Sequence, residues 1–172
     1  MPTPPDPPPE RRDATDEEAR ALASTVRMRI LRVCLGQARS NKEIAEALGR
    51  DPATVLHHVR RLVDTGFLAA QPVRRGTRGS REVPYLATGK SWQISTPGKD
   101  RVLIDAFVEE VALVPAETVR TARVGLRLSE AELEEFEGRF IALLDEYVQR
   151  SDDADGDPWS VFLAVHPDPN RA

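Results

Sequence analysis

Apolar side chains recur at helical spacing through the first part of the chain. Thr15 with Glu18 three residues later has the pattern of a capping box, and the apolar positions that follow predict a helix that begins near residue 15. A second helix is predicted from Val26 to Cys34, and Gly36 is placed to end it. Two short amphipathic helices are therefore predicted at the start of the helical part of the chain.

Two further helices are predicted with only a short turn between them. Ser40, with Glu43 three residues on, begins the first, and Asp51 begins the second with a proline at its first helical position. The second helix covers about residues 52–65, and Gly49 and Arg50 form the turn before its cap. Two helices joined in this way form a helix-turn-helix unit, although an ordinary corner in a helical bundle has the same pattern.

The segment that follows predicts a β-hairpin. Residues 67–73 and 82–87 have the composition of strands, and the glycine-containing stretch 74–81 between them has that of a turn. This stretch contains four arginines and no acid, namely Arg74, Arg75, Arg78 and Arg81. A basic hairpin directly after a helix-turn-helix unit is a wing, which favours a DNA-binding unit over a plain helical corner.

The last part of the chain predicts a second unit. Residues 102–113 are densely apolar and predict a buried helix, whereas 122–128 alternate at period two and predict a strand. A capped helix is predicted from Ser129 to about Arg150, followed by a final strand over 159–165.

These elements define a fold class and three regions. We expect a mainly α fold with a small amount of β (α+β), in which a winged helix-turn-helix DNA-binding domain precedes a helix and a strand-helix-strand unit. The regions are a proline-rich disordered tail (1–13), the winged helix-turn-helix domain (14–97) and a C-terminal dimerisation or effector unit (98–172).

The formal net charge of −4 hides a strong asymmetry along the chain. Residues 20–81 contain 13 Lys and Arg against 4 acids, whereas 1–19 and 82–172 are both acidic. A basic segment between acidic flanks is expected if only the middle of the chain contacts phosphate. The sequence has no signal-peptide pattern and no apolar run of membrane-spanning length, so we expect a cytoplasmic protein.

The predicted second helix of the helix-turn-helix presents a polar face opposite its apolar stripe. Ala53, Thr54 and His57 lie on that face near its start with Arg61 further along, and His58 and Arg60 lie at its margins. Small, hydroxyl, imidazole and guanidinium side chains suit a helix in the major groove, and the basic wing suits phosphate or the minor groove. The candidate DNA-binding residues are Asn41, Lys42, Ala53, Thr54, His57, His58, Arg60, Arg61, Arg74, Arg75, Arg78 and Arg81.

Three stretches resemble the ArsR-type winged-helix regulators. Residues 22–31 look like the entry to their domain, 41–49 resemble their supporting helix, and 54–68 resemble their recognition helix, with His58 and Gly66 at matching positions. The resemblance covers about residues 19–90 and implies a DNA-binding transcription regulator. Leu56 stands where the family often has serine, so a polar contact is absent there.

Other classes of function are less well supported. Some ArsR relatives bind metals through a cysteine pair on the supporting helix, but the only cysteine here is Cys34, on an apolar stripe, so we expect neither a metal nor a cofactor. No nucleophile–base pairing or phosphate loop indicates an enzyme. The serious alternative is a winged helix that binds protein instead of DNA.

The expected partners are double-stranded DNA and a second copy of the chain. We expect the second copy to dock through residues 98–172, with the apolar helix 102–113 as the best candidate surface. A small-molecule effector would bind in the same region, but no residue pattern there identifies the molecule.

Overall fold

The computed structural model describes residues 11–76, 79–96, 100–151 and 156–169. Its contacts divide the chain into two compact units, Glu10–Ala116 and a second unit that contains Glu117–Ala172 together with Met1–Pro9. The division falls after Ala116, whereas the sequence placed the boundary after residue 97. The two units are described one at a time below.

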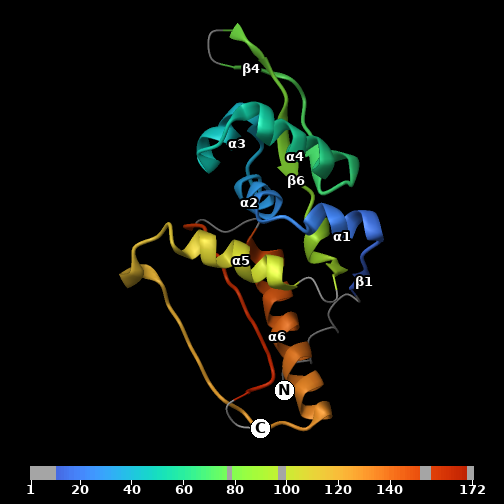
Figure 1. Cartoon of the computed structure of the whole chain (residues 1–172), viewed down its shortest axis with the longest axis vertical. Coiled ribbons are helices and arrows are strands. Elements are labelled where there is room, and N and C mark those ends of the chain that lie inside the picture. Colours follow the sequence, from blue (N-terminus) through green and yellow to red (C-terminus); the bar gives the residue numbers. More distant parts are fainter. Residues whose placement is uncertain (1–10, 77–78, 97–99, 152–155, 170–172) are drawn as a thin grey trace. The chain divides into compact units, whose positions relative to one another are not determined.

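The described part of the first unit contains five α-helices, which account for a little under half of the unit's residues (Figure 1). The predicted capping boxes of Thr15 and Ser40 are both present, and the Asp51 side chain accepts hydrogen bonds from the first backbone amides of its helix. Local sequence thus sets where these helices begin. The helices are α1 (Asp16–Leu22), α2 (Thr25–Val33), α3 (Asn41–Leu48), α4 (Pro52–Asp64) and α5 (Asp100–Val111).

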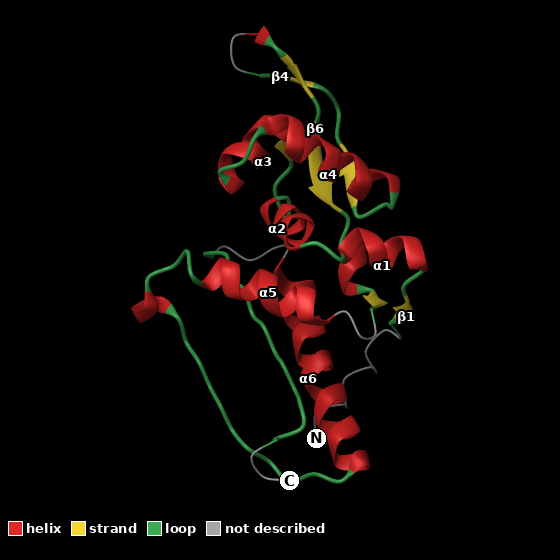
Figure 2. Ribbon diagram, viewed as in Figure 1, coloured by secondary structure: helices red, strands yellow, loops and turns green. Residues whose placement is uncertain are grey.

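A small antiparallel sheet combines one short strand before the helix-turn-helix with two strands after it (Figure 2). Its strand order is β2 (Arg39–Ser40), β6 (Pro84–Ala87) and β3 (Leu68–Ala70), so β6 lies in the middle. Beyond this sheet the hairpin continues as a second pair, β4 (Arg74–Arg75) with β5 (Arg81–Glu82). The structure therefore has the winged helix-turn-helix fold, with the predicted hairpin as its wing.

The core of the first unit lies between α2, α3, α4 and the sheet. Ile30, Ile44, Val55 and Leu62 are fully buried there, as their apolar stripes predicted. Cys34 is also fully buried, and burial raises the pKa of its thiol to about 11. A buried thiol with a raised pKa acts as a small apolar side chain and is chemically inert.

The end of the predicted disordered tail is ordered in the structure. Arg12–Asp13 forms strand β1, which pairs in parallel with β7 (Ile94–Ser95), so the prediction was wrong for these residues; positions 1–10 lie outside the described residues. The Arg12 guanidinium donates to both oxygens of the buried Glu18 carboxylate at 2.7 and 2.9 Å. This long-range pairing supplies the order that the composition of the segment does not predict.

Glu18 ties together four parts of the first unit. Besides Arg12, its carboxylate accepts the backbone amide of Thr15 at 2.9 Å and lies 2.8 Å from Lys90 Nζ in the 3₁₀ helix η2 (Lys90–Trp92). Lys90 Nζ also donates to the Thr65 carbonyl at the end of α4, at 2.6 Å. The hydrogen bonds from Arg12, Lys90 and Thr15 hold the pKa of Glu18 well below its usual range.

Helix α5 packs against α2 and belongs to the first unit. Ala106 is buried in this contact, and two ion pairs flank it, Arg29 with Glu109 at 3.6 Å and Arg32 with Glu110 at 3.9 Å. Burial raises the pKa of Glu110, and the neighbouring arginines oppose that rise. The apolar side chains of 102–113 are thus partly used inside one copy of the chain.

A 3₁₀ turn, η3 (Ala116–Thr118), spans the division along the chain. The second unit contains the long helix α6 (Glu130–Ser151), which begins at the predicted cap, Ser129 with Glu132. The strands predicted over 122–128 and 159–165 are absent: both segments are described and extended, and neither belongs to a sheet (Figure 2). Alternating side chains favour an extended backbone, but a strand also needs a hydrogen-bonded neighbour.

Candidate nucleic-acid interface

The outward face of α4 is set by its buried face. Val55, Val59 and Leu62 are completely buried, so the side chains half a turn away point to solvent. The Asp51 carboxylate accepts the amides of Ala53 and Thr54 at 2.9 and 3.0 Å, which fixes the first turn. Four of the predicted residues on this helix are exposed together, namely Ala53, Thr54, His57 and Arg60.

Arg61 lies at the edge of this face. Its side chain is half-buried, and Nη1 lies 3.1 Å from Oε1 of Glu17 in α1. The sequence predicted an outward position among the base-reading residues, but the structure places the Arg61 guanidinium beside an acid at the flank of α4.

His58 faces α2 and is only half-exposed. Its Nδ1 lies 3.4 Å from Nη1 of Arg27. Burial, and then the nearby charge of Arg27, lower the pKa of His58 below its ordinary value. His57 is the neighbouring residue but points away from the core, with a ring centroid 5.8 Å from that of His58. Of the two histidines, only His57 belongs to the exposed face.

The start of α3 lies beside the start of α4. Asn41 Nδ2 donates to the Pro52 carbonyl at 2.8 Å, which joins the two helices of the helix-turn-helix. Its Oδ1 is buried and has no partner among the described residues. Lys42 is exposed, with Nζ 3.8 Å from Oε1 of Glu46. Asn41 therefore positions the helices, whereas Lys42 is available to an anion.

The wing places two arginines directly opposite each other. Arg75 is the cross-strand partner of Arg81, and Arg74 is the partner of Glu82. Like charges in directly opposed positions destabilise a sheet unless an anion neutralises them. Among the described residues of the hairpin, a bound anion beside Arg75 and Arg81 would therefore reduce the repulsion between two positive charges.

Arg74 is held differently from the other wing arginines. Its Nη2 pairs with Oε2 of Glu43, the same oxygen that accepts the Ser40 amide in the cap of α3. The Ser40 amide and the Arg74 guanidinium lower the pKa of Glu43. This contact attaches the base of the wing to the first turn of α3.

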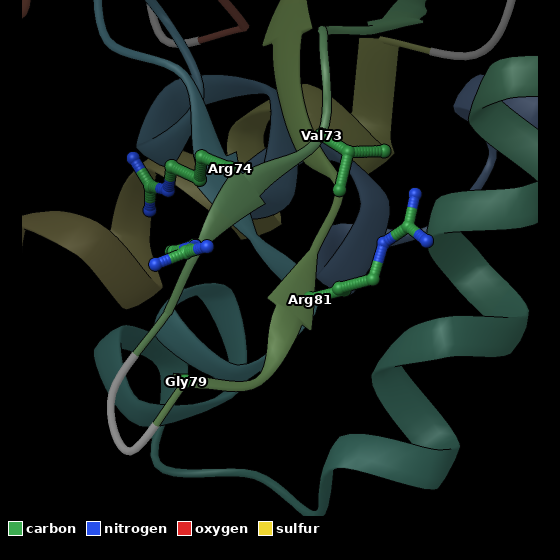
Figure 3. A pocket seen from close by; sticks show the side chains of 5 residues that line it. Val73, Arg74, Gly79 and Arg81 are labelled. Atoms are coloured by element: carbon green, nitrogen blue, oxygen red, sulfur yellow. The ribbon is translucent and has the colours of Figure 1, made fainter.

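The arginines line an open hollow at the wing (Figure 3). Arg74 and Arg81 point to opposite sides of the hairpin, and Gly79, with a φ of +77°, makes the turn in a left-handed conformation that favours glycine. The lining residues are Val73, Arg74, Arg75, Gly79 and Arg81. Arg78 lies outside the described residues.

The roles of two residues at the candidate interface were not predicted from the sequence. Arg50 is exposed in the turn before α4, and its charge also lowers the pKa of His58. A basic residue directly before the Asp51 cap was the available signal. The second is Glu43, whose capping role was predicted but whose pairing with Arg74 depends on a distant hairpin and has no local signal.

In the described part of the chain, no group of three or more His, Cys, Asp or Glu side chains is placed to hold a metal ion. Within the same residues, no helix combines the length and apolar character needed to cross a membrane.

Comparison with known proteins agrees with the fold. Residues 22–75 match a family described as a helix-turn-helix domain. That match covers α2, α3, α4 and the first strands of the wing. No curated protein matches the chain significantly.

Several solved structures of transcription regulators are similar in part. The transcriptional regulator SlyA has 20% identity and a TM-score of 0.33, covering 74% of this chain and 77% of that chain. A mutant of ZitR from Lactococcus lactis has 21% identity and a TM-score of 0.34, and the match covers 72% of this chain and 74% of that chain. MepR, a transcription regulator of the Staphylococcus aureus multidrug efflux pump MepA, has 18% identity and a TM-score of 0.28. That match covers 78% of this chain and 81% of that chain. These TM-scores are too low to support an argument about the function of this chain.

Proposed function

We propose that this protein is a sequence-specific DNA-binding transcription regulator of the ArsR type without the metal-binding cysteines. Its reading head consists of α3, α4 and the wing (74–81). The recognition helix, about 52–65, enters the major groove, and the wing contacts phosphates or the minor groove. The observation that carries the proposal is the opposed pair Arg75 and Arg81 on a hairpin that is attached to the helix-turn-helix.

The charges of the reading head support binding to a polyanion. Residues 20–81 are strongly basic within an otherwise acidic chain. Arg75, Arg81 and Arg60 are exposed, and no ion pair holds them among the described residues. Lys42 and the first turn of α3 add a cation and a helix N-terminus at the same end of the unit. Each phosphate that these groups neutralise adds to a salt-dependent affinity.

The exposure of side chains on the head supports a division of roles within it. Thr54, His57 and Arg60 lie on the exposed face of α4 and can reach base edges, whereas the wing arginines supply contacts that any sequence offers. His58 and Arg61 support the helix at its flanks through Arg27 and Glu17.

A salt titration tests the proposal. The affinity for a random duplex and for a selected duplex is measured by fluorescence anisotropy from low to high salt. We expect binding at low salt that weakens steeply, and we expect the double variant Arg75→Ala, Arg81→Ala to flatten the salt slope by about 2 if each arginine neutralises one phosphate. Failure to bind any duplex at low salt would reject DNA binding and favour a protein-binding winged helix.

A regulator of this kind binds as a homodimer in the cytoplasm. Two heads on one duplex contact half-sites about 34–36 Å apart, so the partner surface must lie outside the reading head. Residues 98–172 supply that surface in this proposal, and a small effector bound there would change the spacing of the two heads.

A further inference from the structure

The second unit exposes apolar side chains along two extended segments, defined as segment A (122–128) and segment B (159–165). In segment A, Val124 is 74% exposed, and in segment B, Val161 is 68% exposed. Large apolar side chains are exposed at the alternating positions Val124, Leu126, Leu128, Val161, Leu163 and Val165, and also at Phe162 in segment B. A face of this kind is unusual on a chain that works alone in water.

The two segments run in the same direction, because α6 returns the chain between them (Figure 1). Arg120, just before segment A, stacks on Trp159 at the start of segment B, with 5.2 Å between the guanidinium carbon and the ring centroid. The segments therefore have the order of a strand-helix-strand unit, and neither one is in a sheet.

We propose that a second copy of this chain covers this surface, and that segment A pairs antiparallel with the same segment of the partner about a two-fold axis at Leu126. This inference deepens the homodimer of the proposed function and rests on it. Segment A then becomes the strand that its alternation predicts, through backbone hydrogen bonds with segment A of the partner.

The exposed apolar area is large enough for an interface with a second copy of the chain. The six alternating apolar side chains and Trp159 expose on the order of 700 Å², close to the roughly 800 Å² that one partner contributes to a standard interface. Helix α5 offers less: Ala106 is buried against α2, and only Ile104 and Val108 remain notably exposed on that helix.

Charge favours a two-fold axis at Leu126 over one at Gly125. An axis at Gly125 would set Arg123 opposite the partner's Arg127, which is unfavourable, whereas an axis at Leu126 sets Arg123 opposite the partner's Ser129. The register at Leu126 also brings the acidic start of α6 in each copy beside the basic start of segment A in the other. An isologous contact needs this self-complementarity.

A cysteine on the axis tests the register. In the full-length protein, Leu126→Cys places two thiols within disulfide distance, and mild oxidation should convert most of the protein to a covalent dimer. Ser160→Cys, on the other side of segment B, is the matched control and should stay largely monomeric. The native Cys34 is buried and gives a silent background.

Sedimentation equilibrium tests the surface. We expect the wild type to be a dimer at micromolar concentration and Leu126→Lys to raise the dimer Kd at least about 100-fold, which is about 2.7 kcal/mol. A monomeric wild type, no covalent dimer with Leu126→Cys, or a dimer lost only in Ile104→Lys, Val108→Lys would overturn the proposal. Binding of the Leu126→Lys variant to a duplex with a single half-site tests the reading head separately. DNA binding can fail while the dimer persists, and the dimer can fail while DNA binding persists.

Discussion

At the scale of single residues, the basic side chains of the reading head fall into two groups. Arg61 and Arg74 are held by the acids Glu17 and Glu43, and Arg60 and Arg75 are exposed among the described residues without such a contact. Charge count alone does not show this difference. The second group is where we expect mutations to change DNA binding most.

His57→Ala tests base reading at the exposed face of α4. We expect it to change the relative affinity for different duplexes by about 1 kcal/mol and to alter binding to random DNA little, because a base contact carries sequence information. Arg61→Ala is the control, since its guanidinium pairs with Glu17. The measurement is competitive binding to a set of duplexes that differ at one base pair, and a uniform loss with His57→Ala would contradict the assignment.

Glu18→Gln tests the ionic junction of the first unit. We expect a loss of about 2 kcal/mol in the free energy of unfolding, because the buried carboxylate accepts charged donors that an amide cannot satisfy. The pKa of Glu18 is lowered in the folded state, so its stabilisation is present above the ordinary value of 4.5 and is lost as the pH falls below it.

Urea unfolding of both proteins between pH 3 and 8 would measure this effect. The difference between wild type and Glu18→Gln should be constant at neutral pH and shrink below about pH 4.5. The exposed neighbour Glu17→Gln should cost less than about 0.5 kcal/mol. A difference that grows in acid would show that the junction does not stabilise the fold.

At the scale of elements, the Glu43–Arg74 pair joins the wing to α3 and also keeps a negative charge at the interface. Glu43→Gln retains the capping box, because an amide oxygen can accept the Ser40 amide. We expect stability within about 1 kcal/mol of wild type and a duplex affinity that rises about fivefold at low salt. Glu109→Gln on α5 removes the same charge away from the head and controls for net charge. Weaker binding by Glu43→Gln would mean that the pair is needed to position the wing.

Elements fixed by neighbouring residues could be predicted from the sequence, and elements fixed by distant ones could not. The caps at Thr15, Ser40 and Asp51 act within one helical turn, so their patterns were sufficient. Strand β1 depends on β7, some 80 residues later, and on Glu18, so the composition of the tail gave no indication of it. The positions of His58 and Arg61 depend on packing against α1 and α2, which helical periodicity does not show.

At the scale of the whole molecule, the two units have different roles in this account. The first unit holds the reading head, with α5 packed on α2 behind it, and the second unit provides the surface for a second copy. The acidic charge of the second unit would repel DNA, which leaves the basic head as the face that approaches the duplex.

The most direct test of the central claim is the map of backbone amide shifts in NMR spectra as a duplex is added to the labelled protein. We expect the shifts to concentrate at the start of α3, along the exposed face of α4 and in the wing, with little change in α5 and at the Glu18 junction. Shifts centred on α1 and α5, or no shifts at low salt, would contradict the claim that this face binds DNA.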